Sequence, residues 1–327
     1  AYDQFLLGAQ FYNNSLFKKL IEYKISPEYS TGTGQLTGAA SIRFNWTPYN
    51  KVFHLISFGV YAKYYHYAEN LAYFRLSPTL TFNFKKSSPR SEWIRTLRLR
   101  TVSVDREEPL AGSDIIPSGD SPNYQLFDMQ YRAEKGSLLN PLIGIADVQF
   151  NKDFVKLSGE IKQRWRLSKY HLITARAFAG YLIPTGNSVD SYFQFGLSGT
   201  RDYLFDYYLI GRSDQSGIWS QQFFVSDGGF KSGSSVFTEN GMLSLSVNAP
   251  LFRYIGIFGD AALYSNQNFA WDYGFYLEFI PDFVEVYFPI QSNFVTQISQ
   301  PNYYKQIRFV LSLELDAILN RVRRGYY

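Results

Sequence analysis

Residues 155–167, with the sequence VKLSGEIKQRWRL, alternate between apolar and charged side chains with a period of two. Successive side chains of a β-strand point to opposite faces, so this segment has one apolar face and one charged face. A helix would spread the same charges around its circumference and would leave no apolar stripe. The spacing therefore predicts a strand over these residues, longer than the roughly five or six residues that are usual in globular proteins.

The same alternation recurs along the chain, at residues 41–47, 79–85, 243–248, 271–279 and 306–316. Repeated segments of about ten residues with one apolar and one polar face are typical of transmembrane β-barrels. A soluble β-sandwich or secreted barrel also alternates, but its strands are usually shorter. We therefore expect an all-β fold, a transmembrane antiparallel β-barrel of about 14–16 strands whose lumen is largely filled by charged side chains and loops.

Composition agrees with this expectation. Aromatic residues make up 19% of the chain, with 27 Tyr and 29 Phe, which suits two girdles of rings at the membrane interfaces. There is no cysteine, as is common in exported proteins. The net charge of +4 is mild and no basic run indicates a nucleic-acid partner. The expected location is the bacterial outer membrane, with outer-membrane lipid and lipopolysaccharide as partners and other subunits of an outer-membrane complex as further candidates.

The pattern predicts one domain over residues 1–327 with an irregular loop or plug region at 184–240. The first strand is expected at 3–12 and a further strand at 142–150, and two strands are expected inside the irregular region, at 191–197 and 218–226. In the strand at 93–104 the alternation slips at Val102 and Val104, which predicts a bulge or the point where the strand leaves the membrane. The chain starts with Ala1-Tyr2 and has no signal peptide, which indicates a mature form or part of a longer polypeptide.

The charged face of the strands has two interpretations. Its residues could line a selective pore, or they could be joined by salt bridges in a filled lumen; the presence of both signs favours the filled lumen. The residues expected to face the lumen are Lys156, Glu160, Lys162, Arg164, Arg166, Arg176, Arg308 and Glu314. Those expected to face lipid are Ile42, Phe44, Trp46, Val155, Leu157, Ile161, Phe309, Leu311 and Leu313.

Motifs of catalysis are missing from the sequence. It contains no HExxH, no GxSxG, no phosphate loop and no cysteine cluster. The three histidines, His54, His66 and His171, have no ligand spacing, although His66 with Glu69, or His171 with a neighbour, could act as a pair. The acidic residues of 105–120 match no calcium loop. We therefore predict no catalytic residue, no metal and no cofactor in these residues.

Residues 193–203, FQFGLSGTRDY, resemble the Gly-x-x-x-Leu-Arg-Gly-Tyr loop of the BamA-type outer-membrane assembly family, with Asp202 in place of the second glycine. In that family the loop folds back into the barrel and its arginine makes contacts in the lumen. The resemblance implies a loop motif of Arg201, Asp202 and Tyr203, with Arg201 inside the barrel.

Longer stretches, at residues 2–14, 199–232, 280–290 and 300–313, resemble the barrel that follows the catalytic part of some Gram-negative gluzincin-type metallopeptidases. In that family a zinc peptidase domain with HExxH precedes an outer-membrane barrel related to the BamA type. HExxH is absent here, so no catalytic residue is carried over. The resemblance implies a membrane anchor or docking platform for an N-terminal peptidase-like domain or an outer-membrane complex. The alternatives are an assembly or translocation barrel of BamA type, a porin-like channel, and an enzyme acting through the loops.

Overall fold

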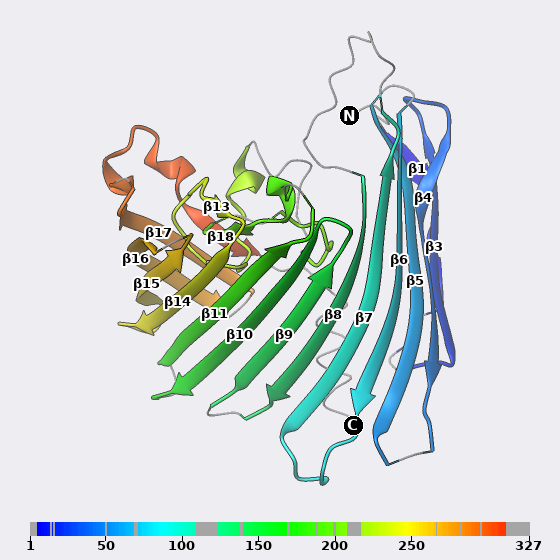
Figure 1. Ribbon diagram of the computed structural model, residues 1–327, viewed down its shortest axis with the longest axis horizontal. Coiled ribbons are helices and arrows are strands. Elements are labelled where there is room, and N and C mark those ends of the chain that lie inside the picture. Colours follow the sequence, from blue (N-terminus) through cyan, green and yellow to red (C-terminus); the bar gives the residue numbers. More distant parts are fainter. Residues whose placement is uncertain are drawn as a thin grey trace. The chain divides into compact units, whose positions relative to one another are not determined.

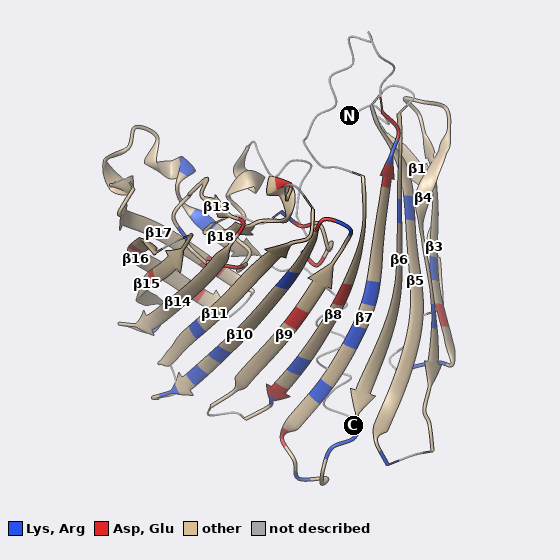
Figure 2. Cartoon of the chain, viewed as in Figure 1, with Lys and Arg blue, Asp and Glu red and all other residues tan. Residues whose placement is uncertain are grey.

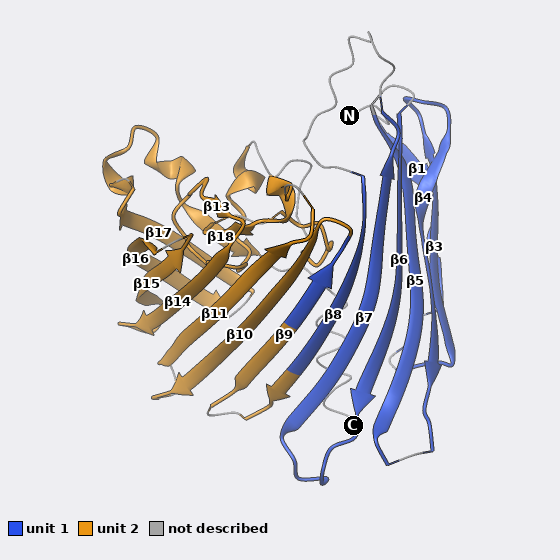
Figure 3. Ribbon diagram, in the orientation of Figure 1, with its two compact units in different colours: residues 1–132, 147–151, 321–327 blue, residues 133–146, 152–320 orange. Residues whose placement is uncertain are grey.

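A computed structural model gives the structure of the chain (Figure 1). It describes residues 5–13, 15, 17–49, 51–68, 71–108, 123–137, 140–168, 171–186, 189–198, 201–207, 217–265, 267–280, 283–294 and 296–311. These residues divide into two compact units, coloured separately in Figure 3. Unit 1 comprises residues 5–132 and 147–151, and unit 2 comprises residues 133–146 and 152–311.

The fold is all-β, and sixteen strands of the described chain form one antiparallel sheet. Their hydrogen-bonded order follows the sequence, from β1 through β3–β11 and β14–β17 to β18, with β2 paired to β3. The early strands are β1 (Leu6–Gly8), β2 (Phe11–Tyr12), β3 (Ile21–Ser30), β4 (Leu36–Trp46), β5 (Phe53–Ala68), β6 (Leu71–Phe84), β7 (Trp93–Arg106), β8 (Tyr124–Lys135) and β9 (Leu142–Phe150). The later strands are β10 (Phe154–Arg166), β11 (Leu172–Pro184), β14 (Gly241–Pro250), β15 (Ile255–Tyr264), β16 (Asn268–Ile280), β17 (Val284–Ser292) and β18 (Arg308–Leu311). Closure of this sheet into a barrel is not detected among the described residues.

Most strand positions agree with the periodicity of the sequence. The strand at 155–167 is β10, and the strand expected at 142–150 has the bounds of β9. Within the described chain no helix is both long enough and apolar enough to span a membrane.

The strand expected at 3–12 is instead two short strands, β1 and β2. Both pair with β3 in a single register, from Leu6↔Ser30 to Tyr12↔Lys24, so the interruption is not a change of alignment. Pro27 lies opposite the gap, where it accepts a hydrogen bond from the Ala9 amide at 3.2 Å. Proline has no amide hydrogen to return. One bond of the ladder is therefore lost at this place, and the strand is split.

Of the two explanations for the slip at Val102 and Val104, the pairing of β6 with β7 contradicts the bulge, and the point where the strand leaves the membrane stays a prediction. Strands β6 and β7 keep one register from Tyr73↔Arg106 to Asn83↔Thr96. Val102 and Val104 are buried on the same face as Arg100, which is also buried. The apparent slip therefore reflects a face that changes from charged to apolar along β7, while the backbone pairing stays regular.

The described residues of the irregular region hold little strand. The segment expected as a strand at 191–197 is the 3₁₀ helix η1 (Ser191–Phe193) followed by β12 (Phe195–Gly196). The segment expected at 218–226 begins as the 3₁₀ helix η2 (Ile218–Gln221), so this strand prediction is wrong. Strand β12 pairs with β13 (Phe237–Thr238) in a separate two-stranded sheet. Both helices lie where the alternation of the sequence is weakest.

Burial along the strands of unit 2 is the reverse of that in a water-soluble sheet. In β14, Leu243 and Leu245 are exposed while Ser244 and Ser246 are buried. In β15, Ile257 is exposed and Asp260 is buried. Figure 2 shows charged residues within the strands themselves, including basic residues along β7 and β10. One face of these strands is thus apolar and open, and the covered face carries the polar side chains together with apolar ones such as Met242 and Phe258.

Candidate functional site

The polar face of unit 2 is contacted by described residues of the irregular region: 189–198, 201–207 and 217–238. We refer to these residues as the inner segment. Its side chains and backbone bond to β10, β11, β14, β15, β16 and β18 in turn. This segment and the strand residues that hold it form the candidate site.

Lys156 on β10 is the first anchor of the inner segment. Its side chain is buried, and Nζ donates hydrogen bonds of 3.1 Å to the carbonyl of Phe193 and to the hydroxyl of Tyr203. The same ammonium lies 4.1 Å from the centre of the Phe195 ring. A buried ammonium needs such acceptors and ring contacts to replace its hydration. The inner segment therefore supplies contacts that stabilise the buried charge of Lys156.

Arg176 on β11 forms the second anchor. Nη2 donates to Glu160 Oε2 at 2.8 Å, and Nη1 donates to the carbonyl of Asp227 at 2.8 Å. Glu160 pairs across the ladder with Phe178, so Glu160 and Arg176 are diagonal neighbours within reach of each other. Arg176 thus joins a strand-to-strand ion pair to the backbone of the inner segment.

Asp227 connects two parts of the inner segment to each other and to the strands. One carboxylate oxygen accepts a hydrogen bond of 3.0 Å from the amide of Gly196 and lies 4.0 Å from Lys156 Nζ. Its backbone carbonyl also accepts from Ser244 on β14 at 3.2 Å. One residue therefore ties β12 to three strands of the sheet.

Asp260 on β15 and Asp272 on β16 make the third anchor. They are direct cross-strand partners, and both are buried. Two carboxyl groups directly opposite each other destabilise a ladder when both are ionised. Lys231 of the inner segment offsets this repulsion with a contact of 2.6 Å from Nζ to Asp260 Oδ1. The amide of Ser232 donates to Asp272 Oδ2 at 2.7 Å. The acidic pair is compatible with the fold because the inner segment supplies a cation and an amide.

Phe223 adds an apolar contact next to these anchors. It is buried with Phe258, Tyr276 and Tyr287, and its ring packs edge-on against Tyr287 with centroids 5.5 Å apart. Its amide donates to the carbonyl of Phe309 at 2.6 Å, and Gln222 forms a parallel bridge with Phe309. The inner segment therefore reaches β18 as well as the middle of the sheet.

Two glycines allow the backbone of the inner segment to pack closely. A Cβ at Gly228 would lie 2.6 Å from the carbonyl oxygen of Leu197. Gly229 has a φ of +71°, and a Cβ there would lie 2.8 Å from Arg176 Nη1. A left-handed conformation and this spacing favour glycine. Both positions lie beside Asp227, where the contacts with the strands are densest.

The loop motif is part of this packing. The guanidinium of Arg201 lies 5.0 Å from the centre of the Phe237 ring and 5.8 Å from that of Tyr192. Asp202 accepts hydrogen bonds from the amides of Asp206 and Tyr207 at 2.8 and 3.1 Å. Tyr203 is buried and bonds to Lys156. The arginine thus packs against rings, and the tyrosine makes the polar contact with the sheet.

The other charged residues expected in the lumen are less enclosed. Lys162 and Arg164 are partly buried, Arg166 is exposed at the end of β10, and Glu314 lies outside the described residues. Arg308 is partly buried and donates from Nη1 to the carbonyl of Ser220 at 3.3 Å. Of the predicted set, Lys156, Arg176 and Arg308 donate hydrogen bonds to the inner segment, and Glu160 is linked to it through Arg176.

The residues expected to face lipid lie mostly on open surfaces. Ile42, Phe44, Trp46, Leu157 and Ile161 are exposed; Val155, Phe309 and Leu311 are partly buried; Leu313 lies outside the described residues. On β10 the exposed positions Leu157, Ile161 and Trp165 all fall on the predicted apolar face, and Lys156 next to Leu157 is buried.

The histidines do not form a cluster in the described structure. His66 is buried in β5, with its Nε2 3.4 Å from the hydroxyl of Tyr64, and Glu69 lies outside the described residues. His171 Nδ1 lies 2.6 Å from Ser168 Oγ in an exposed turn. Among the residues that the structure describes, no group of three or more His, Cys, Asp or Glu side chains could hold a metal ion.

The sequence reasoning missed Asp227, Lys231 and Asp260 as site residues. Asp227 and Lys231 lie in the irregular region, where no periodicity assigns a side chain to a face. Asp260 had a usable signal, since a tight connection at 265–267 between β15 and β16 puts it opposite Asp272. Two acids opposite each other on a covered face indicate that a cation must come from elsewhere in the chain.

Comparison with known proteins adds no relative. No protein-family model matches the chain. No curated protein matches it either.

Proposed function

We propose that this chain is a bacterial outer-membrane β-barrel whose interior is filled by the inner segment, and that it serves as a membrane anchor or docking platform. The observation that carries the proposal is the reversed burial of unit 2. Leu243, Leu245 and Phe275 are exposed on strands where Ser246, Asp260 and Asp272 are covered.

An exposed face of this kind requires an apolar surrounding. Soluble monomers rarely leave large contiguous apolar patches in water. Outer-membrane barrels carry an outward apolar band and a polar interior. In a closed barrel every strand also finds a hydrogen-bonding partner on both sides, which the hydrocarbon region demands. Strands β5, β6 and β7, of 16, 14 and 14 residues, exceed the about 9–11 residues that cross a bilayer.

The contacts of the inner segment favour a filled barrel over a porin-like channel. Lys156, Arg176 and Lys231 are buried and bonded to the inner segment or to acids beside it. A conducting pore would keep its charged residues hydrated. The anchor role itself rests on the resemblance to barrels that follow a peptidase domain. The intact mass of the protein from its native membrane tests that role, because an attached domain raises the mass well above the 37.8 kDa of this chain.

Cysteine scanning tests the membrane placement directly, because the sequence has no cysteine of its own. Leu243, Ser244, Leu245 and Ser246 are replaced by Cys one at a time, labelled with a fluorophore in the unfolded state, and refolded into vesicles. Lipids carrying a bromine quencher should quench labels at 243 and 245 and spare those at 244 and 246. Equal quenching at all four positions would overturn the proposal.

Planar-bilayer recording tests the filled interior separately. We expect no steady conductance from the inserted protein. Steady open-channel currents from protein that passes the quenching test would favour the porin-like alternative and leave the membrane placement intact.

A further inference from the structure

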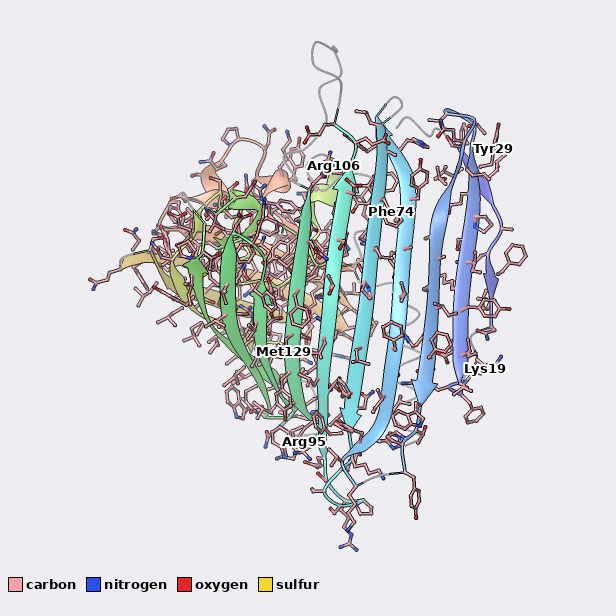
Figure 4. All side chains as sticks on the ribbon, turned by 45° about the vertical axis from the view of Figure 1, so that its right-hand side comes forward. Lys19, Tyr29, Phe74, Arg95, Arg106 and Met129 are labelled. Carbon is pink, nitrogen blue, oxygen red and sulfur yellow. The ribbon has the colours of Figure 1, made fainter. Side chains whose placement is uncertain are left out.

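Exposed cations gather at one end of the strands of unit 1. The turns that join β2 to β3, β4 to β5 and β6 to β7, with the start of β7, meet at this end because the strands alternate in direction. Figure 4 places Lys19 and Arg95 at this end and Tyr29, Phe74 and Arg106 at the other. We name it the basic end; its exposed cations are Lys18, Lys19, Lys51, Lys86, Arg90 and Arg95, and Glu92 is an exposed carboxylate at the same end.

The opposite end of unit 1 has the opposite sign. Asp105, Glu107 and Glu108 are exposed where β7 ends. Arg106, between them, is partly buried, with its guanidinium 4.4 Å from the centre of the Tyr67 ring. The carboxylates are therefore the outermost charges of this described stretch. The two ends of the strands of unit 1 thus carry exposed charges of opposite sign.

Large apolar side chains are mixed with the cations of the basic end. Phe17 and Leu20 are each 69% exposed on either side of Lys18 and Lys19, and Trp46 is 60% exposed where β4 ends. Bulky rings next to long basic side chains suit the boundary between hydrocarbon and headgroups. There the apolar part enters the membrane and the charge reaches the phosphates.

We propose that the basic end of unit 1 binds the phosphates of anionic phospholipids in one leaflet of the membrane. This inference rests on the proposed membrane location. Charge complementarity supports it, because clustered Lys and Arg at a membrane surface attract anionic headgroups.

The one long connection of unit 1 favours phospholipid over lipopolysaccharide, although the other connections at its end, 31–35 and 69–70, are short. The long connection 107–123 leaves β7 at the acidic end. Outer-membrane barrels have long loops outside the cell and short turns toward the periplasm. The basic end accordingly faces the periplasmic leaflet, which consists of phospholipid.

The test uses the full chain in vesicles, with spin-labelled phosphatidylglycerol, phosphatidylcholine and lipid A as probes of the lipid next to the protein. The test variant is Lys51→Gln/Lys86→Gln/Arg90→Gln. The control, Lys24→Gln/Lys152→Gln/Lys305→Gln, removes the same charge from exposed positions outside the basic end. We expect the wild type and the control to prefer phosphatidylglycerol, and the test variant to lose about tenfold of that preference at low salt.

Each outcome decides the inference. Equal preference in the wild type and the test variant would overturn it, as would stronger retention of lipid A than of phosphatidylglycerol. Loss of the preference on adding millimolar inorganic phosphate would also overturn it, by indicating a free-anion site. Failure of the quenching test above would remove both the proposed function and this inference. Insertion without lipid preference would remove the inference alone.

Discussion

The two units stabilise their covered charges in different ways. In unit 1, Arg100 on β7 donates to Asp128 on β8 at 3.1 and 3.2 Å, and Arg98 approaches the same carboxylate at 3.6 Å. These pairs join one strand to the next. In unit 2, Arg176 also pairs with Glu160 on the neighbouring strand, but Lys156, Arg176 and Lys231 all make bonds between strands and the inner segment.

The same alternation of charged and apolar residues is therefore stabilised in two different ways. A strand-to-strand pair needs only the ladder, and Asp128 has two arginines beside it. The acidic pair Asp260 and Asp272 has its cation on a segment that is not part of the sheet. The described ion pairs of unit 1 therefore tolerate the loss of one member better than those of unit 2, and single substitutions can measure this.

The largest effect is expected from Lys231→Met. The change leaves the buried Asp260 and Asp272 facing each other without the ammonium, which should cost about 3–5 kcal/mol of unfolding free energy. Urea unfolding of the refolded protein in micelles, followed by tryptophan fluorescence, measures this loss.

Lys305→Met is the matched control, because Lys305 is exposed in η4 (Tyr303–Lys305). Adding Asp260→Asn to Lys231→Met should recover part of the stability by removing one of the opposed charges. A Lys231→Met variant as stable as the control would contradict the role given to the inner segment.

Phe195→Ala should come next, with a loss of about 3 kcal/mol. The side chain is fully buried; its ring lies 4.1 Å from Lys156 Nζ, and its centroid is 5.8 Å from that of Phe178. The resulting cavity should loosen the inner segment while the ladders of β10 and β11 remain.

Limited proteolysis distinguishes a loosened inner segment from unfolding of the whole protein. If only the inner segment loosens, new cleavage sites are expected within residues 189–238 and not within unit 1. Ile218→Ala, at an exposed position of the same segment, serves as the control. Uniform cleavage across both units would mean that the inner segment and the sheet unfold together.

Ile161→Lys tests the open face of β10 and should destabilise the protein in bilayers by about 2–3 kcal/mol if the position lies near the midplane. Ile161 is 57% exposed, so the substitution removes few internal contacts. Phe44→Lys repeats the test on β4 of unit 1, where the side chain is also exposed. A loss in only one of the two variants would assign lipid contact to one unit alone, and unchanged stability of both in bilayers would contradict the assigned orientation.

The smallest of the four effects is expected from Arg100→Met, about 1.5–2 kcal/mol for the loss of hydrogen bonds to a charged group. Arg98 remains near Asp128 and limits the cost. The double variant Arg98→Met/Arg100→Met should lose distinctly more than the sum of the single changes, because it leaves Asp128 without either arginine. Additive losses in unfolding measurements would count against the shared carboxylate.

Strand positions were predictable because alternation is a local property. The bounds of β9 and the two faces of β10 follow from residue type and spacing alone. The break between β1 and β2 was not recognised, because Pro27 acts across the ladder on Ala9 and not on its own strand. The slip at Val102 could not be separated from a bulge by sequence alone, since a change of side-chain type on one face resembles a change of phase.

The sequence by itself determined that the chain is all-β and that charged side chains share a face of the strands. A period of two depends only on the order of neighbouring residues, so no tertiary information is needed to recognise it. Only the tertiary structure decided how those charges are neutralised. Lys231 reaches Asp260, and Asp227 reaches Lys156, from an irregular segment that carries no period. These long-range pairs depend on where the inner segment lies against the strands. The close packing at Gly228 and the ladder register of β15 with β16 decide that position.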